Sequence, residues 1–393
     1  MKILVIAPTP FFADRGCHVR IYEEAKALLK LGHQIKIVTY HLGKNPEGLD
    51  IQRIISIPWY HKLSAGPAWH KFYLDILLFF KLCQINRVFK ADIIHAHLHE
   101  GCFLAFFLKK IYKIPIVFDL QGSLSGELVD HGFIKNKGFR YKIFYYLEKK
   151  IDHWADHILV SSGIMQKQLI SDFKVSPGYI TIVNDGISGE REKNIFLQDN
   201  QRLADKLSLP KNKKIIVYLG HLSKYQGIDI LIEAVQILIA ERQDFYFLML
   251  GYPEEKYKEK IKKLGLDDYF NFVGRINYQE INDYLSLGQI AISPKLSLVE
   301  SNGKLYNYMA CSLPVIAFDS QVNREILGEN GFYVSQINSN TLAEKLKEIL
   351  SFDDIGLIKI GDNLKTRVWQ KFDWQILILK IDEVYKKLID IQI

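Results

Sequence analysis

The chain has 393 residues, of which 48% are hydrophobic and 24% are charged, so it can bury substantial cores and its length favours two domains. Its four cysteines form no C-x-x-C pair, which excludes a disulfide framework and predicts reduced cysteines in a cytoplasmic protein. The longest lipid-like stretch, residues 74–80, is far shorter than the ~20 residues that a membrane-spanning helix requires. No membrane crossing is predicted.

Positive charge is concentrated in the first half of the chain. Residues 1–170 contain 23 Lys and Arg against 14 Asp and Glu, whereas the remainder contains 28 against 30. Basic and aromatic residues interleave in AWHKFYLDILLFFKL (68–82) and FIKNKGFRYKIFYYLEKK (133–150). This mixture suits peripheral contact with an anionic membrane or a lipid-phosphate substrate. The alternative is an ordinary solvated face with snorkelling lysines, and no nucleic-acid partner is predicted.

Strand-length apolar runs alternate with helical patterns along the first half. MKILVIAPTPFFA resembles a signal peptide but lacks an A-x-A cleavage site, so it is interpreted as the first buried strand. The runs in the first half lie at residues 2–8, 34–40, 92–98, 115–120, 157–162 and 180–183. This rhythm predicts βαβ units and a parallel sheet that is buried on both faces.

The same rhythm begins again after a polar stretch at residues 185–213. The strand-length runs of the second half lie at residues 214–220, 245–251, 269–274, 290–294 and 314–318. A long amphipathic helix is predicted for residues 372–391. The sequence therefore predicts two doubly wound α/β domains, with a boundary near 185–205 and a cleft between them.

Ligands of open parallel sheets bind beyond the carboxyl ends of the strands, so the loops there are the candidate sites. Arg15 and Gly16 follow the first strand and precede a helix, where backbone amides suit an anion or form a plain tight turn. Gln121 follows the strand at 115–120, together with Gly122 and Ser123. Glutamine is no general base, so this loop is predicted to position a substrate.

The stretch SNGKLYNYMAC predicts a helix that starts with small polar residues. Ser301, Asn302 and Gly303 are expected to cap this helix and to bring backbone close to a ligand. The N-terminus of a helix carries a partial positive charge and exposed amides, so such a start can hold phosphate.

Two other motifs argue against particular functions. His95, His97 and His99 alternate along one predicted strand, which suits a metal but equally suits packing or sugar hydroxyls, and no matching acid or cysteine ligand stands out. No metal is therefore predicted. The dinucleotide signature G-x-G-x-x-G is missing after the first strands, which counts against a dehydrogenase.

The combined motifs resemble glycosyltransferase family 4. The segments at residues 218–234, 273–294 and 302–319 look like its donor half, and DIIHAHLHEG looks like its acceptor half. The resemblance implies the GT-B fold, with two Rossmann-like domains facing a cleft. It also implies an acceptor-binding domain at 1–190, a nucleotide-sugar-binding domain at 205–372 and a helix at 373–393 that crosses back to the first domain.

The resemblance further implies transfer of a sugar from a nucleotide-diphosphate donor with retention of configuration and without a catalytic metal or other cofactor. This chain departs from the common pattern at several positions. His221 and Gln226 replace an arginine and a lysine that face the donor diphosphate, and Asn307 replaces a ribose-binding glutamate. Gln121 stands where relatives often have a catalytic histidine, which leaves the donor phosphate as the expected base.

A helix end alone supplies only about half a positive charge to a diphosphate, so a cation is needed. Lys304 is the best candidate, with Arg275 and Lys224 near it in the motifs, and Glu300 is expected to face the donor sugar. The predicted catalytic residues are Gln121, Lys304 and Glu300. The predicted substrate-binding residues are Arg15, Gly16, Gly122, Ser123, Gly220, His221, Gln226, Arg275, Ile276, Ser301, Asn302, Gly303, Leu305 and Asn307.

Three functions are compatible with these residues. The first is a retaining glycosyltransferase that acts on a glycan or lipid-linked acceptor in cell-surface polysaccharide or glycolipid synthesis. The second is a nucleotide-sugar epimerase or hydrolase of the same fold, and the third is a degenerate, non-catalytic nucleotide-sugar binder. The basic first half favours a cytoplasmic protein that acts at the inner face of the cell membrane. The sequence identifies neither the sugar nor the base of the donor.

Overall fold

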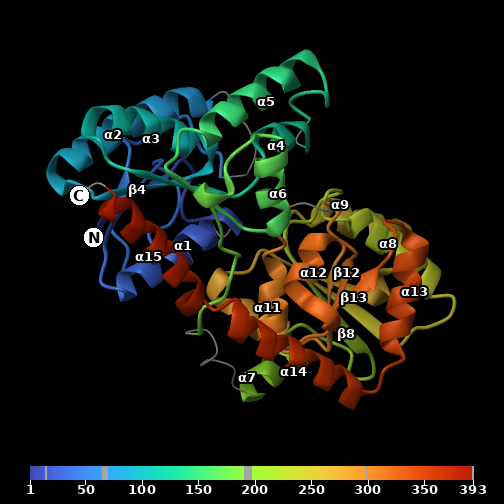
Figure 1. The fold of residues 1–393 in the computed structure, drawn as a ribbon. Helices are drawn as coiled ribbons and strands as arrows, with labels where there is room; N and C mark the ends of the chain where they lie inside the picture. The colour runs from blue at the N-terminus through green and yellow to red at the C-terminus, as the bar shows by residue number, and fades with distance from the viewer. Residues whose placement is uncertain (14–15, 64–69, 131, 190–196, 298–299, 392–393) are drawn as a thin grey trace. The chain divides into compact units, whose positions relative to one another are not determined.

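The computed structural model describes residues 1–13, 16–63, 70–130, 132–189, 197–297 and 300–391. The chain divides into two compact units (Figure 1). Unit 1 comprises Met1–Asn184 together with Trp374–Ile393, and unit 2 comprises Asp185–Asp373. Unit 2 is therefore inserted in the sequence of unit 1, whose last helix follows it along the chain.

Unit 1 is built on a seven-stranded sheet in which all neighbouring strands are parallel. The strand order is β3-β2-β1-β4-β5-β6-β7. The strands are β1 (Lys2–Ala7), β2 (Gln34–Thr39), β3 (Ile51–Arg53), β4 (Ile93–His97), β5 (Ile116–Leu120), β6 (His157–Val160) and β7 (Ile180–Ile182). The helices are α1 (Gly16–Lys30), α2 (His70–Phe89), α3 (Leu98–Tyr112), α4 (Leu124–Asp130), α5 (Phe139–Asp152), α6 (Gly163–Ser171) and α15 (Trp374–Asp390).

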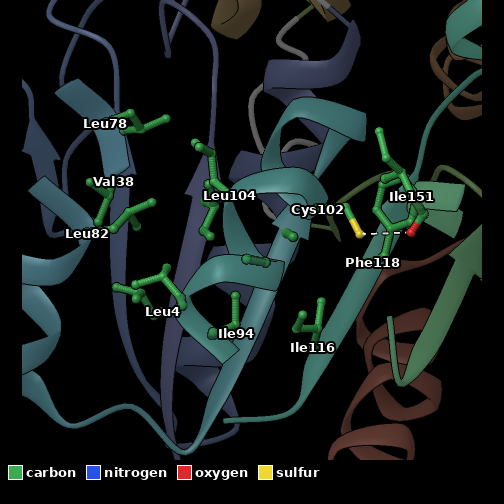
Figure 2. Close-up of a cluster of buried hydrophobic side chains, with 14 of the residues drawn as sticks. Leu4, Val38, Leu78, Leu82, Ile94, Cys102, Leu104, Ile116, Phe118 and Ile151 are labelled. Carbon is green, nitrogen blue, oxygen red and sulfur yellow. Dashed lines mark hydrogen bonds between the residues drawn. The ribbon is translucent and has the colours of Figure 1, made fainter. Parts of the chain in front are cut away.

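Strand alternation in unit 1 gives the sheet one apolar face and one face on which buried polar side chains lie among apolar ones. Ile94 and Phe118 point into a core that also contains residues of α2, α3 and α5, as Figure 2 shows. The thiol of Cys102 lies in this core, 3.6 Å from the carbonyl oxygen of Ile151. Because successive side chains of a strand point to opposite faces, His95 and Asp119 lie on the other face of the same sheet. That face carries α1 and α15.

Unit 2 is built on a six-stranded parallel sheet with the order β10-β9-β8-β11-β12-β13. Its strands are β8 (Lys214–Leu219), β9 (Phe245–Leu250), β10 (Phe270–Gly274), β11 (Ile290–Ser293), β12 (Val315–Phe318) and β13 (Phe332–Val334). Its helices are α7 (Leu197–Lys206), α8 (Ile228–Leu238), α9 (Glu255–Lys263), α10 (Ile281–Leu285), α11 (Lys304–Ala310), α12 (Gln321–Leu327), α13 (Ser339–Leu350) and α14 (Asp354–Lys371).

The prediction of two doubly wound parallel sheets is confirmed. All eleven predicted strands are present, but the short strands β3 and β13 were not predicted because three residues carry too little periodicity. Within the described ranges, none of the helices has the length and apolar content that crossing a bilayer requires.

The final helix, α15, is anchored in unit 1 by buried polar contacts. Tyr385 is buried and its hydroxyl hydrogen-bonds Nδ1 of His95 on β4. Asp382 accepts a 2.9 Å hydrogen bond from Nε2 of His33, which follows α1. The indole of Trp374 lies 5.8 Å from the guanidinium carbon of Arg20 on α1. These contacts join α15 to α1 and to the middle of the sheet.

The Tyr385 contact predicts a measurable loss of stability. Replacing Tyr385 with Phe leaves a buried ring nitrogen of His95 without its partner, which is expected to lower the free energy of unfolding by about 1–3 kcal/mol. Urea unfolding of the purified protein measures this change. The matched control is Tyr179→Phe, at an exposed tyrosine of unit 1, and its unfolding curve should match that of the wild type. Equal curves for both variants would contradict the anchoring role.

Candidate functional site

In unit 1 the sheet face that carries His95 and Asp119 holds a buried cluster of charged and imidazole side chains. His95 and His97 on β4 stack with ring centroids 4.5 Å apart. Nδ1 of His97 lies 2.9 Å from Oδ2 of Asp119 on β5. Oε2 of Glu24 on α1 lies 3.6 Å from Nε2 of His95 and 3.8 Å from Nε2 of His97. Three elements thus bring their polar side chains to one place in the interior of the unit.

Arg20 on α1 compensates the two carboxylates of this cluster. Its guanidinium donates to both oxygens of Asp119 at 2.8–3.1 Å, and Nε lies 3.0 Å from Oε1 of Glu24. Nη1 donates to the carbonyl oxygen of Val183 at 3.0 Å. Burial alone would raise the pKa of Asp119, but the Arg20 charge and the His97 hydrogen bond outweigh it and hold that pKa far below its ordinary value. Asp119 is therefore ionised at neutral pH.

Gln121 is held at the end of β5 by the same cluster. Its amide nitrogen donates to Oδ2 of Asp119 at 2.7 Å and lies 3.1 Å from Nδ1 of His97. The side chain is half-buried, so part of it remains accessible at the carboxyl edge of the sheet. Since its nitrogen faces the ion cluster, its carbonyl oxygen is the group that remains for a ligand.

The three histidines of HAHLHEG do not share one face, and that part of the sequence interpretation is wrong. The strand ends at His97, so His99 lies in the first turn of α3. There Nε2 of His99 lies 3.3 Å from Oδ1 of Asp152 on α5, and burial is outweighed by this carboxyl, which raises the pKa of His99. His99 therefore belongs to the packing between α3 and α5.

The acid partners that the sequence did not reveal do accompany the other two histidines. Glu24, His95, His97 and Asp119 bring one ligand atom each to within 4.8 Å of one another, a donor set that suits a cation. Arg20 already supplies a positive charge to both carboxylates at this place. The expectation that the protein uses no metal stays a prediction.

The other predicted residues of unit 1 lie in loops. Gly16 is the first residue of α1 and is exposed, whereas Arg15 lies outside the described residues. Gly122 and Ser123 form the turn between β5 and α4, where the hydroxyl of Ser123 accepts from the backbone amide of Gly126 at 3.1 Å. Gly16 and Ser123 thus lie after β1 and β5, at the carboxyl edge that was predicted to bind ligands.

In unit 2 the structure gathers several predicted residues around Lys304, the first residue of α11. Its ammonium donates to Oε1 of Gln226 at 2.7 Å and to the hydroxyl of Tyr218 at 3.3 Å, and lies 4.5 Å from the centroid of the Tyr218 ring. A Cβ on Gly220 would lie 3.0 Å from this nitrogen, so glycine keeps the approach open. The end of β8, its following loop and α11 meet here.

The loop that carries Gln226 is held against the next strand by a glycine. Gly227 has φ +75°, and a Cβ there would lie 1.9 Å from the carbonyl oxygen of Pro294, which directly follows β11. No other residue fits both the backbone conformation and the space. This close approach fixes Gln226 beside Lys304.

Among the residues that the structure describes, the ammonium of Lys304 has only neutral acceptors. In the parts of unit 2 that the structure describes, no carboxylate pairs with it. Burial lowers the pKa of Lys304 well below its ordinary value, and the charge of Lys295 lowers it further. A bound anion would oppose both effects. Such an arrangement suits an anion. Lys304 supplies the cation, Gln226 and Tyr218 supply neutral polar groups, and Gly220 leaves space beside the ammonium.

Glu300 lies in a second contact group beside this site. Lys295 is buried, and its ammonium lies 3.1 Å from Oε2 of Glu300 and 2.8 Å from the carbonyl oxygen of Ser301. The hydroxyl of Tyr225 also donates to Glu300. Glu300 is therefore ion-paired and only partly exposed. Its carboxylate is fixed in place at the end of β11.

The polar residues before α11 do not cap it with their side chains, and that prediction is wrong. Gly303 is the N-cap, without a side-chain cap. The amide of Asn302 is buried and bonds Ser293 and Asn323 at 3.0–3.2 Å. The hydroxyl of Ser301 donates to Asp185. These side chains hold the loop, so what Gly303 offers a ligand is exposed backbone.

His221 and Arg275 lie in different loops, and both contact the ring of Tyr252. The ring of His221 makes an edge contact with that of Tyr252 at 5.7 Å, and the Arg275 guanidinium carbon lies 5.1 Å from the same ring. Both side chains are exposed, and Ile276 follows Arg275 half-buried. Exposed Lys224 lies in the loop after β8.

Leu305 and Asn307 lie within α11 itself. Leu305 is fully buried, so its side chain packs in the core of the unit. The amide of Asn307 donates to the carbonyl oxygen of Gly303 at 3.3 Å, within the first turn of its own helix. Tyr308 is buried, donates to the carbonyl oxygen of Ile292 and accepts the backbone amide of Leu219, which ties α11 to the ends of β8 and β11.

Seven residues of these sites were not predicted: Arg20, Glu24, Asp119, Tyr218, Tyr225, Tyr252 and Lys295. Arg20 and Glu24 are spaced i, i+4 on a predicted helix, and Asp119 interrupts the apolar run PIVFDL. Buried charges of this kind require partners, which is a signal in the sequence. The tyrosines gave no such signal because tyrosine packs in cores as readily as it binds ligands.

Two family models match the chain. One, described as glycosyl transferases group 1, matches residues 199–356. The other, described as Glycosyltransferase Family 4, matches residues 15–191. The first match falls in unit 2 and contains the Lys304 site, whereas the second spans nearly all of the first segment of unit 1 and contains the Arg20 cluster.

Individual proteins are similar over most of their length. An uncharacterized glycosyltransferase of Methanocaldococcus jannaschii is 23% identical over 92% of this chain and 92% of that protein. The capsular polysaccharide biosynthesis glycosyltransferase CapM of Staphylococcus aureus is 26% identical over 63% of this chain and 66% of that protein. The crystal structure of Anabaena HepE in complex with UDP-glucose aligns with a TM-score of 0.79 at 18% identity, covering 98% of this chain and 100% of that one.

The Asp119 ion pair predicts a specific pH dependence of stability. Asp119→Asn leaves Arg20 without its main partner and is expected to lower the free energy of unfolding by about 3–5 kcal/mol at neutral pH. The folded-state pKa of Asp119 is depressed, so its contribution is present above its unfolded pKa of ~3.9 and is lost as pH falls below it. The difference in the free energy of unfolding between Asp119→Asn and the wild type should therefore become smaller as the pH falls below ~3.9. Denaturant unfolding across pH measures it, with the exposed Asp362→Asn as control, and a gap independent of pH would contradict the ion pair.

Proposed function

Because the chain belongs to the group 1 glycosyltransferases and has their GT-B fold, we propose that it transfers a sugar from a nucleotide-diphosphate donor to a hydroxyl group, with retention of anomeric configuration. The acceptor is a glycan or a glycolipid, in the synthesis of cell-surface polysaccharide or glycolipid. HepE, a structural relative, has been solved with UDP-glucose, and CapM bears the name of capsular polysaccharide biosynthesis. These relatives support the donor half and the acceptor half of the proposal.

The observation that carries the proposal is the half-buried ammonium of Lys304 with only neutral partners. A nucleoside diphosphate supplies the missing negative charge, and its approach is open on the side of Gly220. Hydrogen bonds between an ammonium and a phosphate oxygen are charge-assisted and stronger than those to the neutral oxygens of Gln226 and Tyr218. The negative charge of a bound diphosphate would raise the pKa of Lys304.

The same contact serves catalysis when the donor breaks. As the bond between the anomeric carbon and the diphosphate oxygen lengthens, negative charge grows on the leaving diphosphate and positive charge grows on the sugar. Lys304 and the exposed backbone at Gly303 stabilise the departing oxygens more strongly in this transition state than in the bound donor. Glu300, fixed by Lys295 and Tyr225, faces the hydroxyls of the donor sugar.

The acceptor is held by unit 1, at the carboxyl edge of its sheet. The carbonyl oxygen of Gln121 and the turn at Gly122 and Ser123 orient the acceptor hydroxyl, which attacks the anomeric carbon from the face that the diphosphate leaves. The proton of that hydroxyl passes to an oxygen of the departing diphosphate, since glutamine cannot take it. We propose that the reaction uses no metal and takes place in the cytoplasm, at the inner face of the cell membrane.

Ligand-dependent thermal unfolding tests the donor half of this proposal. The protein is heated with a panel of nucleoside diphosphates and nucleotide sugars, each far above its dissociation constant. A ligand at about 100 times its dissociation constant stabilises the fold by ~2.7 kcal/mol, which raises the midpoint measurably. One nucleotide is expected to stand out and thereby to identify the base. A panel without any shift would overturn the proposed donor site.

Substitution of Lys304 tests the role of its charge. Lys304→Gln is expected to raise the dissociation constant of the selected nucleoside diphosphate about 10- to 100-fold, because a charge-assisted hydrogen bond contributes about 1.5–3 kcal/mol. Titration calorimetry measures the change, and sugar transfer should fall at least as much. Binding of the corresponding nucleoside, which lacks phosphate, should stay the same.

The matched control for Lys304 is Lys211→Gln, which removes an exposed lysine that precedes β8. Its affinity for the diphosphate should equal that of the wild type. If Lys304→Gln weakens the nucleoside as much as the diphosphate, the side chain supports the fold of the site and does not bind phosphate.

A further inference from the structure

The outer surfaces of α2, α3 and α5 carry an unusual number of exposed apolar side chains. On α2 the exposed apolar side chains form a stripe with a spacing of four residues, Phe72, Ile76 and Phe80, which continues to Val88. The exposed fraction is 76% for Phe72, 65% for Phe80 and 86% for Val88. The other members are Phe103, Phe107 and Ile111 on α3, and Phe139, Ile143 and Tyr146 on α5. We name these side chains the apolar face.

The apolar face is continuous across at least two of its helices. α3 contacts both α2 and α5 within unit 1 (Figure 1). The ring of Phe79 lies 6.1 Å from that of Phe80 and 6.3 Å from that of Phe107, and Phe107 in turn lies 5.1 Å from Phe103. A chain of aromatic contacts thus connects the α2 stripe to α3. Large contiguous apolar surfaces on a folded protein mark places where something binds.

Charge distinguishes the kind of partner that this surface fits. The three helices contain nine Lys and Arg and four Asp and Glu. All four acids are buried or half-buried and have partners in the unit: Asp75 with Tyr40, Glu100 with Lys71, Glu148 with Ser125, and Asp152 with His99. The exposed charged side chains of these helices are therefore all positive, and they include Arg87, Lys110, Arg140, Lys142 and Lys150.

We propose that the apolar face docks unit 1 onto a bilayer that contains anionic lipid. Aromatic side chains that enter the headgroup region, flanked by lysines and arginines, are the composition of interfacial helices, and each basic residue near an anionic surface adds to the attraction. α2 has 20 residues but does not qualify as a spanning helix, so it lies along the surface. The choice of a bilayer as partner rests on the proposed function, in which the acceptor is lipid-linked.

Sedimentation with vesicles tests this docking surface. The full-length protein is mixed with vesicles of phosphatidylcholine alone or of phosphatidylcholine with phosphatidylglycerol. Wild-type protein is expected to bind the anionic vesicles more strongly, and added salt should weaken the binding because exposed charges are screened. The double variant Phe72→Ser/Phe80→Ser should lose ~10-fold or more in vesicle partitioning. Arg87→Gln/Lys110→Gln should reduce the preference for anionic vesicles and its dependence on salt.

The matched control is the double variant Ile355→Ser/Ile358→Ser, in which two exposed isoleucines of α14 in unit 2 are replaced. This variant should bind vesicles as strongly as the wild type does. Circular dichroism confirms that each variant is folded. Equal vesicle binding by the wild type and Phe72→Ser/Phe80→Ser would overturn the inference. So would a dimer in analytical ultracentrifugation that the same substitutions dissociate, since the face would then bind a second copy of the chain.

The nucleotide-dependent thermal shift is measured on the same variants and separates the two proposals. If the variants lose vesicle binding and retain the shift, docking stands apart from donor binding. If the protein binds anionic vesicles through this face but shows no nucleotide shift, the proposed donor site fails and the docking surface stands. A protein that shows the shift but binds no vesicle of either composition would overturn the docking surface alone.

Discussion

The buried ion pair between Arg20 and Asp119 is the constraint on which unit 1 depends. Through it α1 is joined to β5, to the carbonyl oxygen of Val183 after β7, and by ring contact to Trp374 of α15. A buried charge without its partner is costly, so these elements cannot separate independently. The pair therefore fixes the carboxyl end of β5. That end carries Gln121, whose amide is bound to the same carboxylate.

The two units treat charge in opposite ways. In unit 1 each buried charge of the Arg20 cluster is compensated within the protein, which makes the cluster a support for the loop beyond it. In the described part of unit 2 the ammonium of Lys304 donates only to the oxygens of Gln226 and Tyr218, while the carboxylate of Glu300 is paired with Lys295. In the first arrangement Arg20 already supplies the opposite charge to both carboxylates. The second gains from a bound anion, and this difference assigns the diphosphate to unit 2 in the proposed reaction.

The fold was predictable from the sequence because buried parallel strands are continuous apolar runs that stand out between helices. The short strands β3 and β13 were not predicted because each has only three residues. For the site, the sequence predicted which loops take part. Lys304 and Gln226 were both expected near a diphosphate, and Nζ of Lys304 lies 2.7 Å from Oε1 of Gln226. What local pattern could not give was side-chain direction. Asn302 and Ser301 turn away from the helix that they were expected to cap, and Arg20 and Asp119 are 99 residues apart in the sequence.

The insertion of unit 2 into unit 1 has a consequence for how the chain folds during its synthesis. The strands of unit 1 precede unit 2 in the chain, but Tyr385, Asp382 and Trp374, which contact His95, His33 and Arg20, are made only after all of unit 2. Until α15 emerges from the ribosome, the sheet face that carries His95 has α1 but lacks its second helix, whereas all of unit 2 has already been made. Unit 1 can therefore close only after unit 2 has been made, and a nascent chain depends on α15 for that step.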